Sequence, residues 1–340
     1  MKSVAREPLG ILGLSVKISI AMATYNGSRF LREQLDSFLT QTRLPDEVII
    51  SDDCSADETL QIVRAFAERA PFSVVLIKNR YRMGCTANFS QALMKAKGDL
   101  VFLSDQDDVW LPIKIERMVD YAQNDPASLV LMNDAALTDV WLGDTGLTKL
   151  GQIASAGLSQ TRFVMGACAA VRRELLEVCL PIPAKYRSHD SWIVGMADGI
   201  GRRRVFSDVL QFYRRHEENV SHFIANRTRR VTRLQRWAAE FGRLVSSRGY
   251  DQYLQEVIDQ EGVFLRGVLD ACARSAPPTM RELEQFARRL ERRVDLLTVR
   301  LALSRRPRWR RSIGVLSLVR KGAYEEFSGL KTAIQDLISR

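Results

Sequence analysis

The stretch GDLVFLSDQDDVWLP, residues 98–112, predicts a buried strand that ends in a cluster of carboxylates. The apolar run of residues 100–103 is followed closely by Asp105, Asp107 and Asp108. Carboxylates repel one another and are costly to remove from water, so such a cluster needs a positive partner. If the chain stays extended there, Asp105 and Asp107 face the same side. Hard divalent cations favour oxygen ligands, so the stretch predicts a site for Mg²⁺ or Mn²⁺, although a solvated acidic turn has the same pattern.

The segments around this stretch alternate between apolar runs typical of strands and patterns typical of helices. Short connections join them, and the apolar runs cover residues 17–25, 46–53, 72–79, 99–105 and 127–134. This alternation predicts an α/β fold, a Rossmann-like and mostly parallel sheet flanked by helices on both faces.

Polar side chains fall at the ends of four of these predicted strands. They occupy residues 24–26, 52–53, 105–107 and 133–134. In open α/β sheets, ligands bind at the carboxyl ends of the strands. The four clusters therefore predict one site and name the residues that line it.

The composition is that of a globular protein, with an uneven charge. The chain has 340 residues, 46% hydrophobic and 26% charged, and a net charge of +10. Residues 226–340 hold 24 basic and 13 acidic side chains and show long helical patterns. We therefore expect an N-terminal extension over residues 1–16, an α/β domain over 17–225, and a basic helical region over 226–340.

Several function classes lose support from the sequence. The five cysteines are scattered and form no CxxC pair, which argues against a disulfide framework or a zinc site and favours a reducing cytosol. The apolar stretch before residue 26 is interrupted by Lys17 and has no cleavage pattern, so we expect a strand there instead of a signal peptide. No G-x-x-x-x-G-K-[ST] or G-x-G-x-x-G motif follows the first strand, which argues against P-loop and dinucleotide-binding proteins. A metal-bridged diphosphate without a glycine cradle suits a nucleotide-sugar better.

A series of motifs resembles the family 2 glycosyltransferases of GT-A type, and the likeness covers roughly residues 17–223. The motifs are ISIAMATYNGSRFLREQLDSFLTQT, VIISDDCSADET, FLSDQDDVWLPIKIE, FVMGACAAVRRELL, SHDSWI and FYRRHEENVSH, in this order. DQDDVW followed by HDSW and YRRHEEN is most similar to bacterial rhamnosyltransferases that build cell-surface polysaccharides. The resemblance implies an inverting, metal-dependent transfer of a sugar from a nucleoside diphosphate to a hydroxyl of a glycan or lipid-linked acceptor. It implies L-rhamnose from dTDP-rhamnose as the sugar.

The resemblance also implies roles for matching residues at the strand ends. Tyr25 would stack on the pyrimidine, Asp53 would accept a hydrogen bond from the base, and Asp52 would support the loop. Cys54 stands where the family commonly has glycine. The metal would be held by Asp105, Asp107 and His216. The full set expected to bind the nucleotide is Thr24, Tyr25, Asn26, Asp52, Asp53 and Asp105.

The resemblance makes Asp190 the catalytic base that takes the proton of the acceptor hydroxyl. His189 has an unperturbed pKa nearer neutrality and is the alternative base, or the residue that orients Asp190. A His-Asp pair that caps a helix near Trp192 is the structural alternative. Contacts with the sugar, the acceptor or the diphosphate are expected from Asp134, His189, Trp192, Arg214 and Arg215, and His222 has no assigned role. Ordinary turn or surface residues remain the alternative for Asp134 and for the two arginines.

A basic stretch over residues 304–322 holds six arginines, one lysine and Trp309 around an apolar middle. This composition favours peripheral binding to an anionic membrane surface, in keeping with a cytoplasmic protein on the inner face of the cell membrane. An exposed helical surface or a homo-oligomer interface is the alternative, and no nucleic-acid motif accompanies the charge. Two other functions stay open: a sugar nucleotidyltransferase, and a non-catalytic membrane- or nucleic-acid-binding module on the same scaffold.

Overall fold

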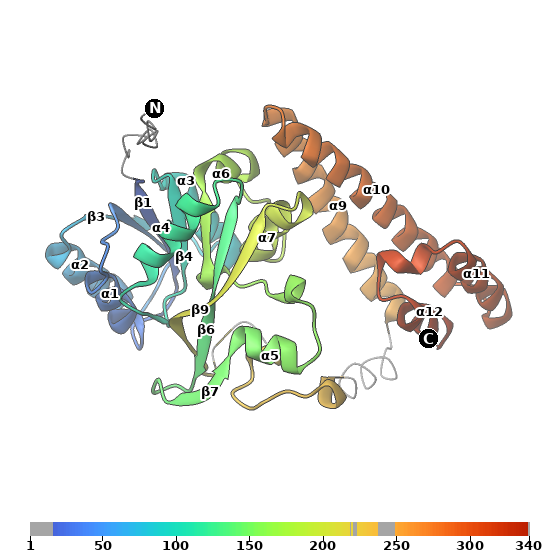
Figure 1. Cartoon of the computed structure of the whole chain (residues 1–340), viewed down its shortest axis with the longest axis horizontal. Coiled ribbons are helices and arrows are strands. Elements are labelled where there is room, and N and C mark those ends of the chain that lie inside the picture. Colours follow the sequence, from blue (N-terminus) through green and yellow to red (C-terminus); the bar gives the residue numbers. More distant parts are fainter. Residues whose placement is uncertain (1–15, 218, 220–222, 237–248, 339–340) are drawn as a thin grey trace, which may run out of the picture.

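The computed structural model describes residues 16–217, 219, 223–236 and 249–338. The expected N-terminal extension, apart from residue 16, and His222 lie outside the described residues. One sheet with helices against it forms the larger part of the molecule, and a group of helices extends from it (Figure 1).

The first half of the sheet is parallel, in the order β3-β2-β1-β4. β1 is apolar and almost fully buried along its length, as expected for a central strand covered on both faces. Its pairing sets Thr24 beside Asp52, and Met22 beside Ser104 at the end of β4. The predicted polar clusters of the first, second and fourth strands therefore meet at one edge. The strands are β1 (Ile18–Thr24), β2 (Glu47–Asp52), β3 (Ser73–Lys78) and β4 (Leu100–Ser104).

The second half of the sheet is mixed and contains both parallel and antiparallel pairs. β8 (Ala169–Arg172) inserts antiparallel between β4 and β6 (Val130–Thr138), because the chain leaves β6 through the hairpin strand β7 (Asp144–Thr148) before it returns. β9 (Arg203–Arg214) runs parallel to β6, and β5 (Val109–Trp110) pairs antiparallel with β9.

The fifth predicted strand continues beyond its expected end. Asn133 and Asp134 lie inside β6, which runs on through Ala135 and Leu137. The pairing of β6 with β9 shifts register on both sides of Asp134. This irregularity in the ladder accommodates two polar residues within a buried strand.

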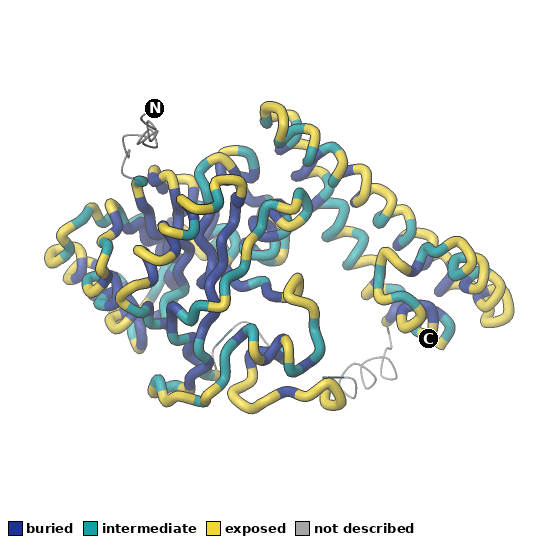
Figure 2. The backbone as a smooth tube through the Cα atoms, in the orientation of Figure 1, coloured by how far each residue is buried: buried dark blue, intermediate teal, exposed yellow. Residues whose placement is uncertain are grey.

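Helices cover both faces of the sheet and form two cores (Figures 1 and 2). The core on one face lies beneath α1 (Leu31–Leu39), α2 (Thr59–Arg69) and α4 (Lys114–Asn124), and it includes Leu35, Phe66 and Met118. The core on the other face lies beneath α3 (Cys85–Lys95), α6 (Arg173–Cys179) and α7 (His189–Gly199), and it includes Phe89, Leu176 and Trp192. The short helix α5 (Lys149–Ser155) follows β7.

The described residues after 249 are helical, as predicted. α9 and α10 lie side by side, and α11 and α12 follow at their far end (Figure 1). Phe264 and Leu283 belong to the same core as Trp192, so α9 and α10 are packed onto the α/β part of the molecule instead of forming a separate core there. Over the described part of the chain, no helix is both long and apolar enough to cross a membrane. The helices are α9 (Tyr250–Arg274), α10 (Thr279–Ser304), α11 (Arg308–Arg320) and α12 (Leu330–Ile338).

A buried ion pair joins the last helices. The guanidinium of Arg300 donates to both carboxylate oxygens of Asp336, at 2.9 and 3.0 Å. The hydroxyls of Tyr250 and Tyr324 donate to the same carboxylate. All four side chains are buried, so the charges are compensated inside the helical region.

Candidate active site

The turn after β4 holds three carboxylates in a confined space. Asp105 and Asp107 are partly buried, and Asp108 is fully buried. Burial, followed by the charges of Asp107 and Asp190, raises the pKa of Asp105 to about 7. Burial and the neighbouring carboxylates also raise the pKa of Asp108 well above its usual range. Positive charge is therefore favoured at this turn.

Lys114, at the start of α4, supplies part of that positive charge from the protein itself. It is buried, and its ammonium donates to the carbonyl of Ala167 at 2.9 Å and to the side chain of Gln211. Gln211 in turn donates to Asp108 at 3.0 Å. Burial lowers the pKa of Lys114 to about 8, against the raising effect of Asp108 and Asp105. Asp108 is therefore a structural carboxylate, and the sequence interpretation missed its counter-charge.

Asp107 and His216 converge from two distant segments. Nε2 of His216 lies 2.7 Å from Oδ2 of Asp107. Asn219 braces the pair: its amide donates to Asp107 at 3.2 Å, and its Oδ1 accepts from the backbone N–H of His216 at 2.8 Å. A carboxylate and an imidazole facing one point form a donor set that fits a divalent cation.

The described side chains do not supply all the ligands of such a cation site. Among the described residues, no group of three or more His, Cys, Asp or Glu side chains is arranged to hold a metal ion. The remaining ligands are not found among the described side chains, and Mg²⁺ is commonly shared between one or two carboxylates and substrate phosphates.

Arg214 is placed differently from the sequence interpretation. It is buried, and its guanidinium donates to Glu33 at 2.6 Å and to the carbonyls of Asp107 and Val140 at 2.9 and 2.7 Å. These bonds fasten the carboxylate turn to α1 and to the turn that follows β6. Arg214 therefore positions Asp107, and the expected contact with a diphosphate is not supported.

The loops after β1, β2 and β4 are joined by side-chain hydrogen bonds. The amide of Gln106 pairs with the backbone of Tyr25, accepting its N–H at 2.9 Å and donating to its carbonyl at 3.1 Å. Asp52 is buried and accepts from the hydroxyl of Thr24 at 2.9 Å and from Ser55. Thr24 and Asp52 thus support the loop that presents Tyr25.

Three further residues of the predicted nucleotide site bridge neighbouring loops. Asn26 accepts from the backbone N–H of Ala56 at 2.9 Å. Asp53 accepts from the backbone N–H of Met83 at 2.6 Å and of Gly84 at 2.8 Å. Cys54 adopts a φ of 65°, a left-handed conformation that favours glycine.

Asp190 lies in the first turn of α7. Its Oδ1 bonds to the hydroxyl of Ser188 and accepts from the backbone N–H of Ser191 at 2.7 Å, and the residue that caps the helix is Ser188. Oδ2 has no hydrogen-bond partner within the described part of the chain, and Asp190 lines a cavity. His189 is stacked on Phe89 at 3.8 Å between ring centroids. Burial lowers the pKa of His189, which favours the neutral imidazole.

Two residues expected at the substrate make their hydrogen bonds within the protein. Trp192 is buried in the core, and its indole N–H donates to the carbonyl of Cys179 at 2.8 Å. It faces inward because it lies on the side of α7 that packs against α9. Asp134 is buried and accepts from the backbone N–H of Ala135 and of Leu150, at 2.8 and 2.9 Å. It ties β6 to the start of α5.

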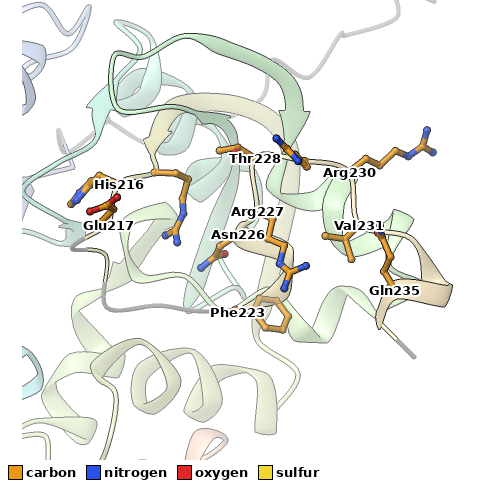
Figure 3. Close-up of a pocket in the computed structure, with 11 residues that line it drawn as sticks. His216, Glu217, Phe223, Asn226, Arg227, Thr228, Arg230, Val231 and Gln235 are labelled. Atoms are coloured by element: carbon orange, nitrogen blue, oxygen red, sulfur yellow. The ribbon is translucent and has the colours of Figure 1, made fainter. Parts of the chain in front are cut away.

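Two cavities lie beside the carboxylate turn, and Phe223 and Asn226 line both. The smaller has a volume of about 340 Å³ and is lined by Asp105, His189 and Asp190. The larger has a volume of about 790 Å³ and a basic lining. In Figure 3 the side chains of Phe223, Asn226 and Arg227 are grouped, whereas Arg230 points away from them. The wall of the larger cavity includes Arg215, His216, Glu217, Arg227, Thr228, Arg229, Arg230, Val231 and Gln235.

Three residues of this site were not found from the sequence: Lys114, Lys149 and Asn219. Asn219 lies within a motif already quoted, so proximity in the chain could have indicated it. Lys149 also lines the smaller cavity, but its neighbours in sequence carry no signal of that. Only the folding of the β7–α5 segment against β6 brings it there.

Comparisons with known proteins agree with this architecture. Residues 19–180 match Glycosyl transferase family 2. The crystal structure of S. aureus TarS 1-349 in complex with UDP-GlcNAc superposes with a TM-score of 0.52 at 18% identity, covering 81% of this chain and 90% of that one. The GT-A fold predicted from the sequence is confirmed.

Curated relatives include glycosyltransferases with different donors in their names. An uncharacterized glycosyltransferase of Nostoc sp. is 29% identical over 214 residues, and the match covers 60% of this chain and 66% of the relative. The Escherichia coli UDP-Glc:alpha-D-GlcNAc-diphosphoundecaprenol beta-1,3-glucosyltransferase WfaP is 27% identical over 207 residues, covering 60% and 79%. The Shigella flexneri dTDP-rhamnosyl transferase RfbG is 34% identical over 103 residues, covering 29% and 36%. The likeness to family 2 glycosyltransferases therefore covers residues 19–180 of this chain.

Proposed function

We propose that this chain, built on a family 2 glycosyltransferase domain, is an inverting, metal-dependent enzyme that transfers a sugar from a nucleoside diphosphate to an acceptor hydroxyl. The observation that carries the proposal is the convergence of Asp107 and His216 at the carboxyl edge of the sheet, next to a cavity lined by Asp190. Asp107 and His216 would hold a divalent cation, Mg²⁺ or Mn²⁺, and the motif resemblance adds Asp105, which does not stand in a three-ligand group with them among the described residues. That cation would supply charge neutralisation for the diphosphate.

In one displacement step, one residue of the chain accepts the proton and another offsets the charge of the leaving group. Asp190 accepts the proton of the acceptor hydroxyl through Oδ2, while Ser188 and the N-terminal turn of α7 hold Oδ1. A bond forms between the acceptor oxygen and the anomeric carbon, and the bond from that carbon to the phosphate oxygen breaks. The electron pair leaves with the nucleoside diphosphate, and Arg215, which lines the larger cavity, lies where it can offset that charge. One in-line displacement inverts the anomeric centre.

The nucleotide would lie against Tyr25, with Asn26 and Asp53 holding the surrounding loops. The guanidinium of Arg82 lies 4.1 Å from the centroid of the Tyr25 ring, so a cation covers one face of that ring. A stacked base would use the other face or replace Arg82. We propose dTDP-rhamnose as the donor on the motif resemblance, supported by the match to a dTDP-rhamnosyl transferase.

Titration of nucleotide-sugars tests this function. Calorimetry with dTDP-rhamnose, UDP-glucose and GDP-mannose, each with and without Mn²⁺, is expected to show one donor that binds in a metal-dependent manner. Asp107→Ala is expected to abolish that dependence, whereas Asp120→Ala, an exposed carboxylate on α4, is expected to leave it unchanged. Failure of all three donors to bind the folded protein would refute the transferase, and metal-dependent binding of UDP-glucose alone would refute rhamnose.

We also propose that α11 and α12 contact an anionic membrane surface, which would bring the site to a lipid-linked acceptor. Three apolar side chains on α11 are more than half exposed: Trp309 at 62%, Ile313 at 64% and Leu316 at 52%. Leu330, Ile334 and Ile338 on α12 are also exposed. The exposed basic residues of the 304–322 stretch are Arg305, Arg306, Arg308, Arg310, Arg320 and Lys321. Apolar side chains among arginines are typical of peripheral membrane helices.

Sedimentation with vesicles tests the membrane contact. Binding to phosphatidylglycerol vesicles that exceeds binding to phosphatidylcholine vesicles and falls with salt is expected. The double variant Trp309→Ala with Ile313→Ser should lose most of it, while Leu234→Ser, an exposed leucine outside these helices, should not. Equal binding by both variants, or none by the unmodified protein, would contradict the proposal.

A further inference from the structure

We propose that the smaller cavity beside Asp190 binds an anionic group of the acceptor, a carboxylate or a phosphate, and that Lys149 is the cation that holds it. The inference rests on the proposed function and narrows its acceptor to a charged class. It assigns a binding role to a residue for which the sequence motifs suggest none.

Lys149 is a buried lysine that forms no ion pair with any of the described residues. Its side chain is 3% exposed at the start of α5, and it lines the same cavity as His189 and Asp190. Among the residues that the structure describes, its ammonium makes no hydrogen bond or ion pair, and its one aromatic contact is Phe223, with Nζ 5.0 Å from the ring centroid. A buried charge is costly unless it is paired, so a ligand that brings an anion to this cavity would recover that cost.

Burial shifts the pKa of this lysine. It lowers the pKa of Lys149 to about 7, with Arg215 acting in the same direction and Asp134 and Asp190 in the opposite one. The ammonium therefore stands close to deprotonation in the free protein. A bound anion would favour the charged form.

Two arginines extend the positive charge to the rim of the cavity. Arg162, at the end of the short helix of residues Gln160–Arg162, and Arg187, in the loop before α7, line the cavity and are exposed. Guanidinium groups bind carboxylates and phosphates through paired hydrogen bonds. A volume of about 340 Å³ falls in the range of small-molecule sites, roughly 300–1,000 Å³.

The position of Lys149 favours the acceptor over the donor. His216 and Arg215, which the proposed function gives to the metal and the diphosphate, line the larger cavity, and Lys149 does not. Asp105, which is also given to the metal, lines the smaller cavity with Lys149. Lys149 shares its cavity with Asp190, whose free oxygen would receive the acceptor proton. An anion at Lys149 therefore belongs to the molecule whose hydroxyl faces Asp190.

Calorimetric binding of three small probes tests this inference. The protein is first saturated with dTDP or UDP and Mn²⁺, and then titrated with methyl β-D-glucuronide, glucose 1-phosphate and methyl β-D-glucoside. We expect one of the two anions to bind at least about tenfold more tightly than the neutral glucoside, because a hydrogen bond to a charged partner is worth that much. Preference for the glucuronide identifies a carboxylate, and preference for the sugar phosphate identifies a phosphate.

Variants of Lys149 separate a ligand cation from a structural one. Lys149→Met should remove the preference and leave nucleotide binding unchanged, and Lys149→Arg should retain part of it. Lys185→Met, which removes an exposed charge that lines neither cavity, is the matched control and should have no effect.

Three results would overturn the inference. One is that the unmodified protein binds neither anion more tightly than the glucoside. Failure to bind either anion at millimolar concentration counts as the same result. Another is a preference that survives Lys149→Met, and the third is equal loss of nucleotide binding in that variant, which would place Lys149 in the donor site. The nucleotide titration comes first, so absence of nucleotide binding counts against the proposed function, and bound nucleotide without anion preference counts against this inference alone.

Discussion

Replacement of Gly267 by alanine should destabilise the protein, although alanine is the better helix former. Gly267 lies within α9, where it packs against Trp192 of α7. A Cβ atom there would lie 2.0 Å from Cη2 and 2.6 Å from Cζ2 of that indole, closer than non-bonded carbon atoms approach. Trp192 cannot easily yield, because its N–H is bonded to the carbonyl of Cys179 and its ring contacts Tyr186 and Phe264.

The magnitude follows from two opposing terms and a control on the same helix. Gly→Ala in an open helix gains about 1 kcal/mol, and overpacking a filled core costs typically about 1–3 kcal/mol. At Gly262 of α9 the nearest heavy atom to an added Cβ is Nη1 of Arg266 at 3.8 Å, so only the gain applies. Because the contact at Gly267 is so short, we take the upper end of the cost. The net loss is then about 2 kcal/mol, or roughly 4–8 °C in melting temperature.

Chemical and thermal unfolding of the two variants measures the difference. Gly267→Ala should be less stable than Gly262→Ala by about 3 kcal/mol, the overpacking cost alone. Since Trp192 follows Asp190 by two residues on α7, kcat should also fall by about 10-fold to 100-fold through misplacement of the base. Donor binding should be unchanged, because Asp107 and His216 lie outside α7. Equal stability of the two variants would refute the packing of α9 on α7.

Three further changes test other parts of the structure. Asp336→Ala leaves the buried guanidinium of Arg300 uncompensated and should lower the free energy of unfolding by about 3–5 kcal/mol, and a loss below 1 kcal/mol in urea titration would contradict the buried pair. Cys85 should react slowly with N-ethylmaleimide, because desolvation of its thiol and then the charges of Asp105 and Asp190 raise the thiol pKa to about 12. Bound donor and Mn²⁺ should slow the labelling of Cys85 further, as measured by peptide mass spectrometry. Unchanged labelling would mean that the donor binds elsewhere. Lys149→Met should stabilise the protein below pH 7, because the lowered folded-state pKa makes protonation costly there, and the gain should fade between pH 7 and the unfolded pKa of about 10.4. Equal gains at pH 6.5 and pH 9.5 would contradict the burial of that ammonium.

Local patterns in the sequence determined the first half of the fold and the position of the site. The alternation of apolar runs and helical patterns over residues 17–105 depends on neighbouring residues, and β1 to β4 follow it to within one or two residues. A parallel sheet brings the ends of such strands to one edge. Tyr25, Asp53 and Asp105 could therefore be placed together before any coordinates were known.

The sequence could not determine which polar residues face the ligand and which support the fold. Trp192, Arg214 and Asp134 have the chemistry of site residues, and the structure directs each to a partner within the protein. Their roles depend on contacts across 13, 181 and 16 residues of chain, which no local pattern encodes.

The tertiary structure alone placed two cations near the carboxylates. Lys114 reaches Gln211 across 97 residues, and Lys149 enters the cavity of Asp190 because β6 carries the β7–α5 segment there. The tertiary structure also decided that the second half of the sheet is mixed, since β8, the strand that pairs with β4, follows a hairpin and a helix in the chain. Periodicity reports which residues are buried within an element. The burial and charge of a side chain in a site depend on which distant elements pack beside it, and that is decided only when the chain is folded.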